Sequence, residues 1–155
     1  MDPIHRLVQI TSADVYTFAL EAHDFNPIHM DDAAARAAGF EGRICHGALL
    51  TAIISGMIAD AFPGAVWMEH TIQFKRPALV GQTLEFILSF DETIKKPAKT
   101  LGILTVEVKN TAGALLATSR NVVLLPAAAA SDAEMPALRK PQPEAALTAS
   151  DARPH

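Results

Sequence analysis

The stretch DFNPIH, residues 24–29, places a carboxylate, a carboxamide, a proline and an imidazole within six positions. A carboxylate can accept a proton and an imidazole can accept or donate one, so Asp24 and His29 could act as an acid–base pair. Pro27 fixes its own φ and restricts Asn26, which would hold both groups in a small volume. Asn26 can also donate and accept hydrogen bonds. Two such groups facing one water would activate it for addition to a polarised double bond, or run the reverse elimination.

The same residues are also typical of a turn that starts a helix. Asn-Pro is a common turn dipeptide. Asp24 and Asn26 could form Asx turns with their own backbone, and His29 could then face solvent. The six residues by themselves leave both interpretations open.

A second candidate, His46-Gly47, stands where a long apolar stretch begins. A helix that starts there would present free N–H groups and the positive end of its dipole. Gly47 has no side chain, so a ligand could approach its backbone closely. Such donors suit the oxygen of a thioester carbonyl whose negative charge grows during reaction. Alternatively, Gly47 only permits a tight turn and His46 caps the helix.

The elements that would position these residues follow from periodicity. Residues 4–10 alternate imperfectly and indicate a strand, and residues 11–24 indicate a short helix with Thr11 and Asp14 in a capping box. A further short helix is predicted over 31–40. Residues 47–62 are apolar nearly all round, as in a helix enclosed by other structure.

The second half of the chain changes to period two. Four β-strands are predicted, over residues 66–77, 83–94, 100–110 and 114–125. The connections between them are short, at 80–82, 95–99 and 110–113, which implies an antiparallel sheet. The simplest packing wraps that sheet around the apolar helix. One such unit leaves strand edges open, so pairing with a second copy is expected.

Composition narrows the functional classes. The chain has 155 residues, a net charge of -4 and no long run of Lys or Arg, which argues against nucleic-acid binding. Cys45 is the only cysteine, so an internal disulfide and a Cys-rich metal site are excluded, and a reducing cytoplasm suits the chain. The sequence shows no signal peptide and no membrane span. We expect one domain over residues 1–126 and an Ala/Pro-rich disordered tail over 127–155.

Residues 24–55, DFNPIHMDDAAARAAGFEGRICHGALLTAIIS, resemble the hydratase signature of the MaoC-like dehydratases, specifically the (R)-specific enoyl-CoA hydratases. The likeness extends from about residue 11 to 125. It implies an α+β hot-dog fold, in which an antiparallel sheet wraps a long helix, usually as a homodimer. The implied reaction is reversible hydration of a trans-2-enoyl-CoA to an (R)-3-hydroxyacyl-CoA. No metal or redox cofactor is implied, because coenzyme A arrives as part of the acyl-CoA substrate.

The resemblance also assigns roles by position. Asp24 and His29 would be the catalytic pair that holds and activates water. Ser55, eight residues after Gly47, matches the active-site serine of the family, and the Gly47 amide would meet the thioester carbonyl. The predicted substrate-binding residues are Asn26, His46, Gly47 and Ser55. The chain departs from the family pattern at Ala22-His23, where Ser-Gly is usual, and at Ala48, where Met is frequent.

Two other functions remain open from the sequence. A hot-dog thioesterase would need an acid on the central helix, and Asp60 is the candidate. A non-catalytic acyl-CoA-binding subunit of a heteromeric dehydratase is the other alternative. Lys75 and Arg76, or the KKPAK loop, could meet coenzyme A phosphates. Cys45 is interpreted as a buried small residue rather than a nucleophile, and His70 as structural.

Overall fold

The computed structural model describes residues 1–126, so the predicted tail, 127–155, lies outside the described residues. The elements in chain order are β1 (Ile4–Gln9), α1 (Ser12–Ala22), α2 (Pro27–Met30), α3 (Asp32–Ala37), α4 (Gly47–Ala61), β2 (Val66–Phe74), β3 (Thr83–Lys96), β4 (Lys99–Asn110) and β5 (Leu115–Leu124). No helix within residues 1–126 combines the length and the apolar character that crossing a bilayer requires.

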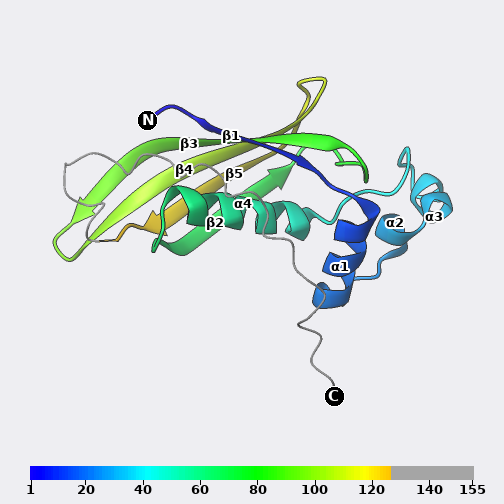
Figure 1. The fold of residues 1–155 in the computed structure, drawn as a ribbon, viewed down its shortest axis with the longest axis horizontal. Coiled ribbons are helices and arrows are strands. Elements are labelled where there is room, and N and C mark those ends of the chain that lie inside the picture. The colour runs from blue at the N-terminus through cyan, green and yellow to red at the C-terminus, as the bar shows by residue number, and fades with distance from the viewer. Residues whose placement is uncertain (127–155) are drawn as a thin grey trace, which may run out of the picture.

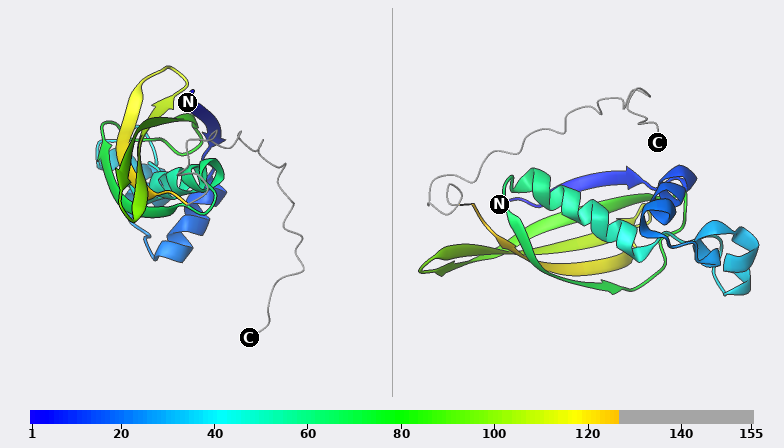
Figure 2. Two further views of the ribbon diagram at one scale, coloured as in Figure 1. Left: turned by 90° about the vertical axis from the view of Figure 1, so that its left-hand side faces the viewer. Right: turned by 90° about the horizontal axis from the view of Figure 1, so that it is seen from below.

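The five strands form one antiparallel sheet in the order β1-β3-β4-β5-β2. The sheet curves around α4, which lies along its concave face, while α1, α2 and α3 gather at one end (Figures 1 and 2). This is the hot-dog arrangement, and it confirms the predicted α+β fold. The sheet ends at β1 on one edge and at β2 on the other.

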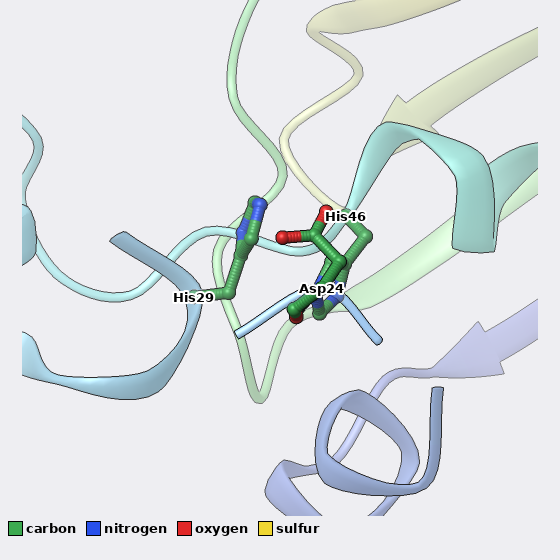
Figure 3. A group of neighbouring side chains, drawn as sticks. All are labelled: Asp24, His29 and His46. Atoms are coloured by element: carbon green, nitrogen blue, oxygen red, sulfur yellow. Dashed lines mark hydrogen bonds between the residues drawn. The ribbon is translucent and has the colours of Figure 1, made fainter. Parts of the chain in front are cut away.

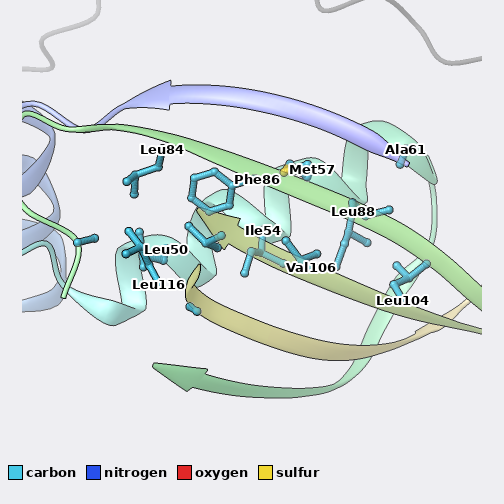
Figure 4. Close-up of a cluster of buried hydrophobic side chains, with 14 of the residues drawn as sticks. Leu50, Ile54, Met57, Ala61, Leu84, Phe86, Leu88, Leu104, Val106 and Leu116 are labelled. Carbon is cyan, nitrogen blue, oxygen red and sulfur yellow. The ribbon is translucent and has the colours of Figure 1, made fainter. Parts of the chain in front are cut away.

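The core lies between α4 and the sheet (Figure 4). The helix residues that it contains include Leu50, Ile54, Met57 and Ile58, and the sheet residues include Phe86, Leu88, Leu104 and Val106. All are at most 4% exposed. Exposure of a helix that is apolar all round to water is unfavourable, and burial against a curved sheet removes that cost. Burial therefore fixes where α4 lies and where its N-terminus opens.

The local signals before α4 have mixed outcomes. The capping box of Thr11 and Asp14 is present at the start of α1, as predicted. The DFNPIH stretch contains the one-turn helix α2, which was not among the predicted helices. Asn26 caps that helix and Pro27 occupies its first turn, where its missing N–H costs nothing.

The predicted connection over residues 95–99 is mostly strand. Lys96 pairs with Lys99 at the end of the β3–β4 ladder, so only Pro97 and Ala98 form the turn. Proline cannot donate to a ladder hydrogen bond and is tolerated in the turn, whereas the lysines on either side can pair. The prediction of a five-residue connection was therefore too long.

Candidate active site

Asp24 lies in the short loop between α1 and α2, and local hydrogen bonds shape that loop. Its carboxylate accepts a hydrogen bond from the Asn26 backbone N–H at 3.1 Å. The Asn26 side chain in turn accepts from the Ile28 N–H at 3.5 Å, as the cap of α2. The Asx-turn chemistry expected of these residues is therefore present. It orients the carboxylate of Asp24 at the same time.

His29 is carried by α2 and is 7% exposed. Its Nδ1 lies 2.7 Å from the backbone carbonyl oxygen of Ile44. A carbonyl only accepts hydrogen bonds, so Nδ1–H is the donor and the neutral ring keeps its lone pair on Nε2. Nε2 is thus the nitrogen at which His29 can gain or lose a proton.

His46 joins this pair, although it is far along the chain. The side chains of Asp24, His29 and His46 each offer a ligand atom, and these atoms all lie within 4.8 Å of one another (Figure 3). The His46 ring is 2% exposed, and its Nε2–H donates to the backbone carbonyl of Asp24 at 3.0 Å. The rings of His29 and His46 face each other with centroids 3.9 Å apart and planes tilted by 32°.

A carboxylate and two imidazoles are also a donor set for a divalent metal. Here, however, His29 Nδ1–H and His46 Nε2–H both donate to carbonyl oxygens. One nitrogen on each ring remains as an acceptor, Nε2 of His29 and Nδ1 of His46.

A cavity of about 390 Å³ adjoins the cluster, and His29 and Gly47 lie in its wall together with Phe74, Lys75 and Arg76. The N-terminus of α4 opens into this cavity. A Cβ placed on Gly47 would lie 2.5 Å from the Phe74 ring, so a larger residue at this position would require that ring to move. The first N–H groups of a helix have no intrahelical acceptor, so the Gly47 amide is available to a ligand.

Cys45 also lines the cavity but is poorly suited to nucleophilic attack. Burial, with a smaller contribution from Asp14, raises the pKa of the Cys45 thiol to about 11. The thiolate is the reactive form, so almost none of it exists near neutral pH. This agrees with the interpretation of Cys45 as a small buried residue.

The remaining predicted residues lie in different places. Asn26 is exposed and caps α2. Ser55 is partly buried on α4, two turns beyond Gly47, which corresponds to a helical rise of about 12 Å. It is absent from the described wall of the cavity. The fold therefore brings together Asp24, His29, His46 and Gly47, whereas Ser55 lies apart from them. The role of each of these residues stays a prediction.

Comparisons with known proteins agree with this architecture. Residues 2–112 match the family model described as a MaoC like domain. An (R)-specific enoyl-CoA hydratase from Aeromonas caviae is 35% identical over 117 residues, which cover 74% of this chain and 86% of the relative. The solved (R)-hydratase of A. caviae, involved in PHA biosynthesis, superimposes with a TM-score of 0.74 at 30% identity, covering 81% of this chain and 95% of that one.

A mitochondrial 3-hydroxyacyl-[acyl-carrier-protein] dehydratase from Arabidopsis thaliana is 38% identical over 74 residues. That match covers 48% of this chain and 45% of the relative, so the chain spans less than half of the plant protein.

The fold, the family match and these relatives define an enzyme of the hydro-lyase class built on a hot-dog fold. The chain belongs to the MaoC-like family.

His23 departs from the family glycine yet adopts the backbone conformation that favours glycine. It ends α1 with φ 53° and ψ 32°, and its N–H donates to the Ala19 carbonyl. It is the only residue other than glycine with positive φ in residues 1–126. A side chain in this left-handed region costs free energy, and glycine avoids that cost. The residue immediately before Asp24 is therefore strained.

We expect His23→Gly to raise the free energy of unfolding by about 1 kcal/mol, because it relieves the left-handed strain at the end of α1. Urea denaturation measures this change. Glu21→Gly is the matched control, since it places glycine inside the same helix and should destabilise by about 1 kcal/mol. A His23→Gly protein no more stable than the unmodified chain would contradict the strain.

Proposed function

We propose that the chain catalyses the reversible hydration of a trans-2-enoyl-CoA to an (R)-3-hydroxyacyl-CoA. Asp24 and His29 act on one water molecule and on the double bond. The relatives from A. caviae and A. thaliana support a hydratase or dehydratase reaction on an acyl thioester. The observation that carries the proposal is the meeting of a carboxylate with an imidazole whose Nε2 is free, beside a cavity at a helix N-terminus.

In the hydration direction, the Asp24 carboxylate accepts a proton from water while the water oxygen bonds to C3 of the enoyl group. The electron pair of the double bond moves toward the thioester, and the imidazolium of His29 delivers a proton from Nε2 to C2. In dehydration, neutral His29 removes the C2 proton and protonated Asp24 donates to the departing hydroxyl. Both side chains must reach the reacting atoms of one bound substrate. The polar atoms of Asp24 and His29 lie within 4.8 Å of each other, which suits that requirement.

Negative charge grows on the thioester oxygen when water adds to C3 in hydration and when C2 is deprotonated in dehydration. The Gly47 N–H, at the positive end of α4, is suited to stabilise that charge. Because His29 and Gly47 lie in the wall of one cavity, a thioester bound there could meet both at once. We therefore assign the carbonyl contact to the Gly47 amide.

The thioesterase alternative depends on Asp60, and the structure argues against it. Asp60 stands near the end of α4, about 20 Å of helical rise from Gly47, and forms an ion pair with Arg6 of β1. Its side chain is 67% exposed. A carboxylate so placed cannot activate water beside the cavity at the other end of the helix.

A non-catalytic acyl-CoA-binding subunit remains the second alternative. Such a subunit has no need to orient Asp24 and His29 toward each other, whereas both are oriented here by hydrogen bonds to the backbone. Binding of acyl-CoA by the purified chain without any turnover would favour this alternative.

Coenzyme A is proposed as the carrier because Lys75 and Arg76 lie in the wall of the cavity. Lys75 donates to the Gln73 side chain and Arg76 to the Leu115 carbonyl, both neutral acceptors. Within residues 1–126 neither cation forms an ion pair with a carboxylate. Two unneutralised cations beside a thioester site fit the phosphates of coenzyme A.

The chain is further proposed to act as a homodimer. Within residues 1–126, strand β2 pairs only with β5 and its other edge is open, and Val66, Met68 and Phe74 on this strand are each more than half exposed. An exposed apolar edge strand favours pairing with another chain.

Sedimentation equilibrium of the purified chain should give twice the monomer mass, and a monomer at micromolar concentration would exclude this assembly.

Asp24→Asn and His29→Ala should each lower kcat on crotonyl-CoA by about 10²–10⁴-fold, because each removes one member of the acid–base pair. The loss of enoyl-thioester absorbance measures the rate. Asp31→Asn is the matched control: Asp31 caps α3 nearby, and asparagine caps equally well, so its activity should be unchanged. Near-normal rates for Asp24→Asn would refute the proposed pair.

Gly47→Ala should abolish measurable hydration, because the new methyl group collides with the Phe74 ring beside the carbonyl contact. The double variant Gly47→Ala/Phe74→Ala removes the collision but leaves the Gly47 N–H in place. We expect it to recover activity to within about a hundredfold of the Phe74→Ala protein, since the backbone donor is retained. Full activity of Gly47→Ala alone would show that close approach at this position is not required.

The double variant Lys75→Gln/Arg76→Gln should raise KM for crotonyl-CoA about tenfold, because two exposed ion pairs together contribute roughly 1.4 kcal/mol. Steady-state kinetics with crotonyl-CoA and with crotonyl-pantetheine separates the causes. The pantetheine thioester has no phosphates, so its KM should not respond to the two substitutions. Equal effects on both thioesters would place the phosphates elsewhere.

A further inference from the structure

His46 begins α4 but does not cap it. Its side chain makes no capping hydrogen bond, although it occupies the N-cap position. Instead, Nε2–H donates to the backbone carbonyl of Asp24 at 3.0 Å, across 22 residues of chain. This bond ties the loop that carries the proposed base to the N-terminus of the central helix. The hydrogen bond therefore holds Asp24 near the end of α4 at which Gly47 lies.

The His46 ring also supports His29 from one side. It contacts both Phe18 of α1 and His29 of α2, with ring centroids 5.0 Å and 3.9 Å away respectively. His29 is held in its own plane by the bond from Nδ1–H to the Ile44 carbonyl. The face contact with His46 restrains the remaining direction of motion, rotation of the ring out of that plane. Together the two contacts fix where Nε2 of His29 points.

Stability does not explain an imidazole at this position. Nδ1 of His46 is buried and has no hydrogen-bond partner within residues 1–126. A buried polar atom without a partner costs free energy, and an aliphatic side chain of similar size would avoid that cost. The ring is 2% exposed, so solvent does not compensate. What an imidazole adds over leucine here is the hydrogen bond to Asp24 and a flat face against His29.

We propose that His46 is a positioning residue for the Asp24–His29 pair, an inference that rests on the proposed hydratase function. It acts through the backbone of one partner and the ring face of the other, and it does not touch the substrate. This differs from the substrate-binding role that the sequence suggested for His46. Losing the contact frees the Asp24 loop, and displacement of a reacting group by about 1 Å can cost about 10²-fold in rate.

Two substitutions separate the roles of His46. His46→Leu keeps the packing but removes the donor, and we expect kcat on crotonyl-CoA to fall about 10²-fold while KM changes less than about twofold. His46→Gln places an amide N–H near the position of the imidazole Nε2–H, so kcat should stay within about tenfold of the unmodified chain. Phe18→Leu is the matched control, since it loosens another packing contact of the same ring and leaves the hydrogen bond intact. Thermal unfolding of each variant shows whether it is folded.

The outcomes discriminate between explanations. An unchanged kcat in His46→Leu overturns the proposal, and a raised KM with unchanged kcat returns His46 to substrate binding. A kcat in His46→Gln as low as in His46→Leu rejects the hydrogen bond as the positioning contact. Equal losses in Phe18→Leu and His46→Leu would mean that packing alone is responsible.

A measurement without substrate keeps this inference separate from the proposed function. In ¹⁵N-histidine NMR of the full chain, the buried Nε2–H of His46 should give a slowly exchanging imidazole resonance that disappears in His46→Gln. Its absence from the unmodified chain overturns the contact, even if His46→Leu fails to fold. If the resonance is present but the chain hydrates no enoyl-CoA, the proposed function fails while the structural link stands.

Discussion

The packing of α4 against the concave face of the sheet is the constraint on which the rest of the structure depends. A helix of 15 residues that is apolar nearly all round must be enclosed, and five antiparallel strands provide the enclosure. Once α4 is fixed in this way, its N-terminus stands at one end of the sheet, where α1, α2 and α3 also gather (Figure 1). The free N–H groups and positive dipole end of the helix thus lie where the DFNPIH stretch can reach them.

The turn and the proposed acid–base pair depend on the same local structure. Asn26 caps α2 and its backbone N–H bonds to the Asp24 carboxylate, which are the contacts of an ordinary Asx turn. The same contacts aim Asp24 toward the side of the loop on which His29 lies (Figure 3). Pro27 then starts α2 so that His29, two residues later, is buried. A stiff turn is a low-entropy way to hold a pair of groups, so the structural and the functional interpretation require the same residues.

Patterns that are local in sequence were predictable, and contacts between distant segments were not. The capping box of Thr11, the apolar helix and the four later strands follow from short-range periodicity and hydrogen-bonding rules. The hydrogen bond of His46 to Asp24 joins segments 22 residues apart, and nothing in the letters around either residue encodes it. The sequence placed His46 at the start of a helix, where its ring was expected to act as the cap. That the ring bonds to another segment instead becomes visible only in the structure. The position of Ser55 was predicted from resemblance alone, and one chain does not bring it to the cavity.

The open edge of the sheet and the proposed site share a residue. Phe74 ends β2, is 54% exposed, and its ring lies against Gly47 in the wall of the cavity. Burial of an exposed aromatic ring is favourable, and a strand edge can be buried by pairing with another strand. A chain that paired along β2 and buried Phe74 would also cover part of the cavity wall. Under the proposed function, assembly and exclusion of water from the site would then be coupled through one side chain, because burial of Phe74 would lower the local dielectric around the Gly47 N–H and strengthen its interaction with a developing oxyanion.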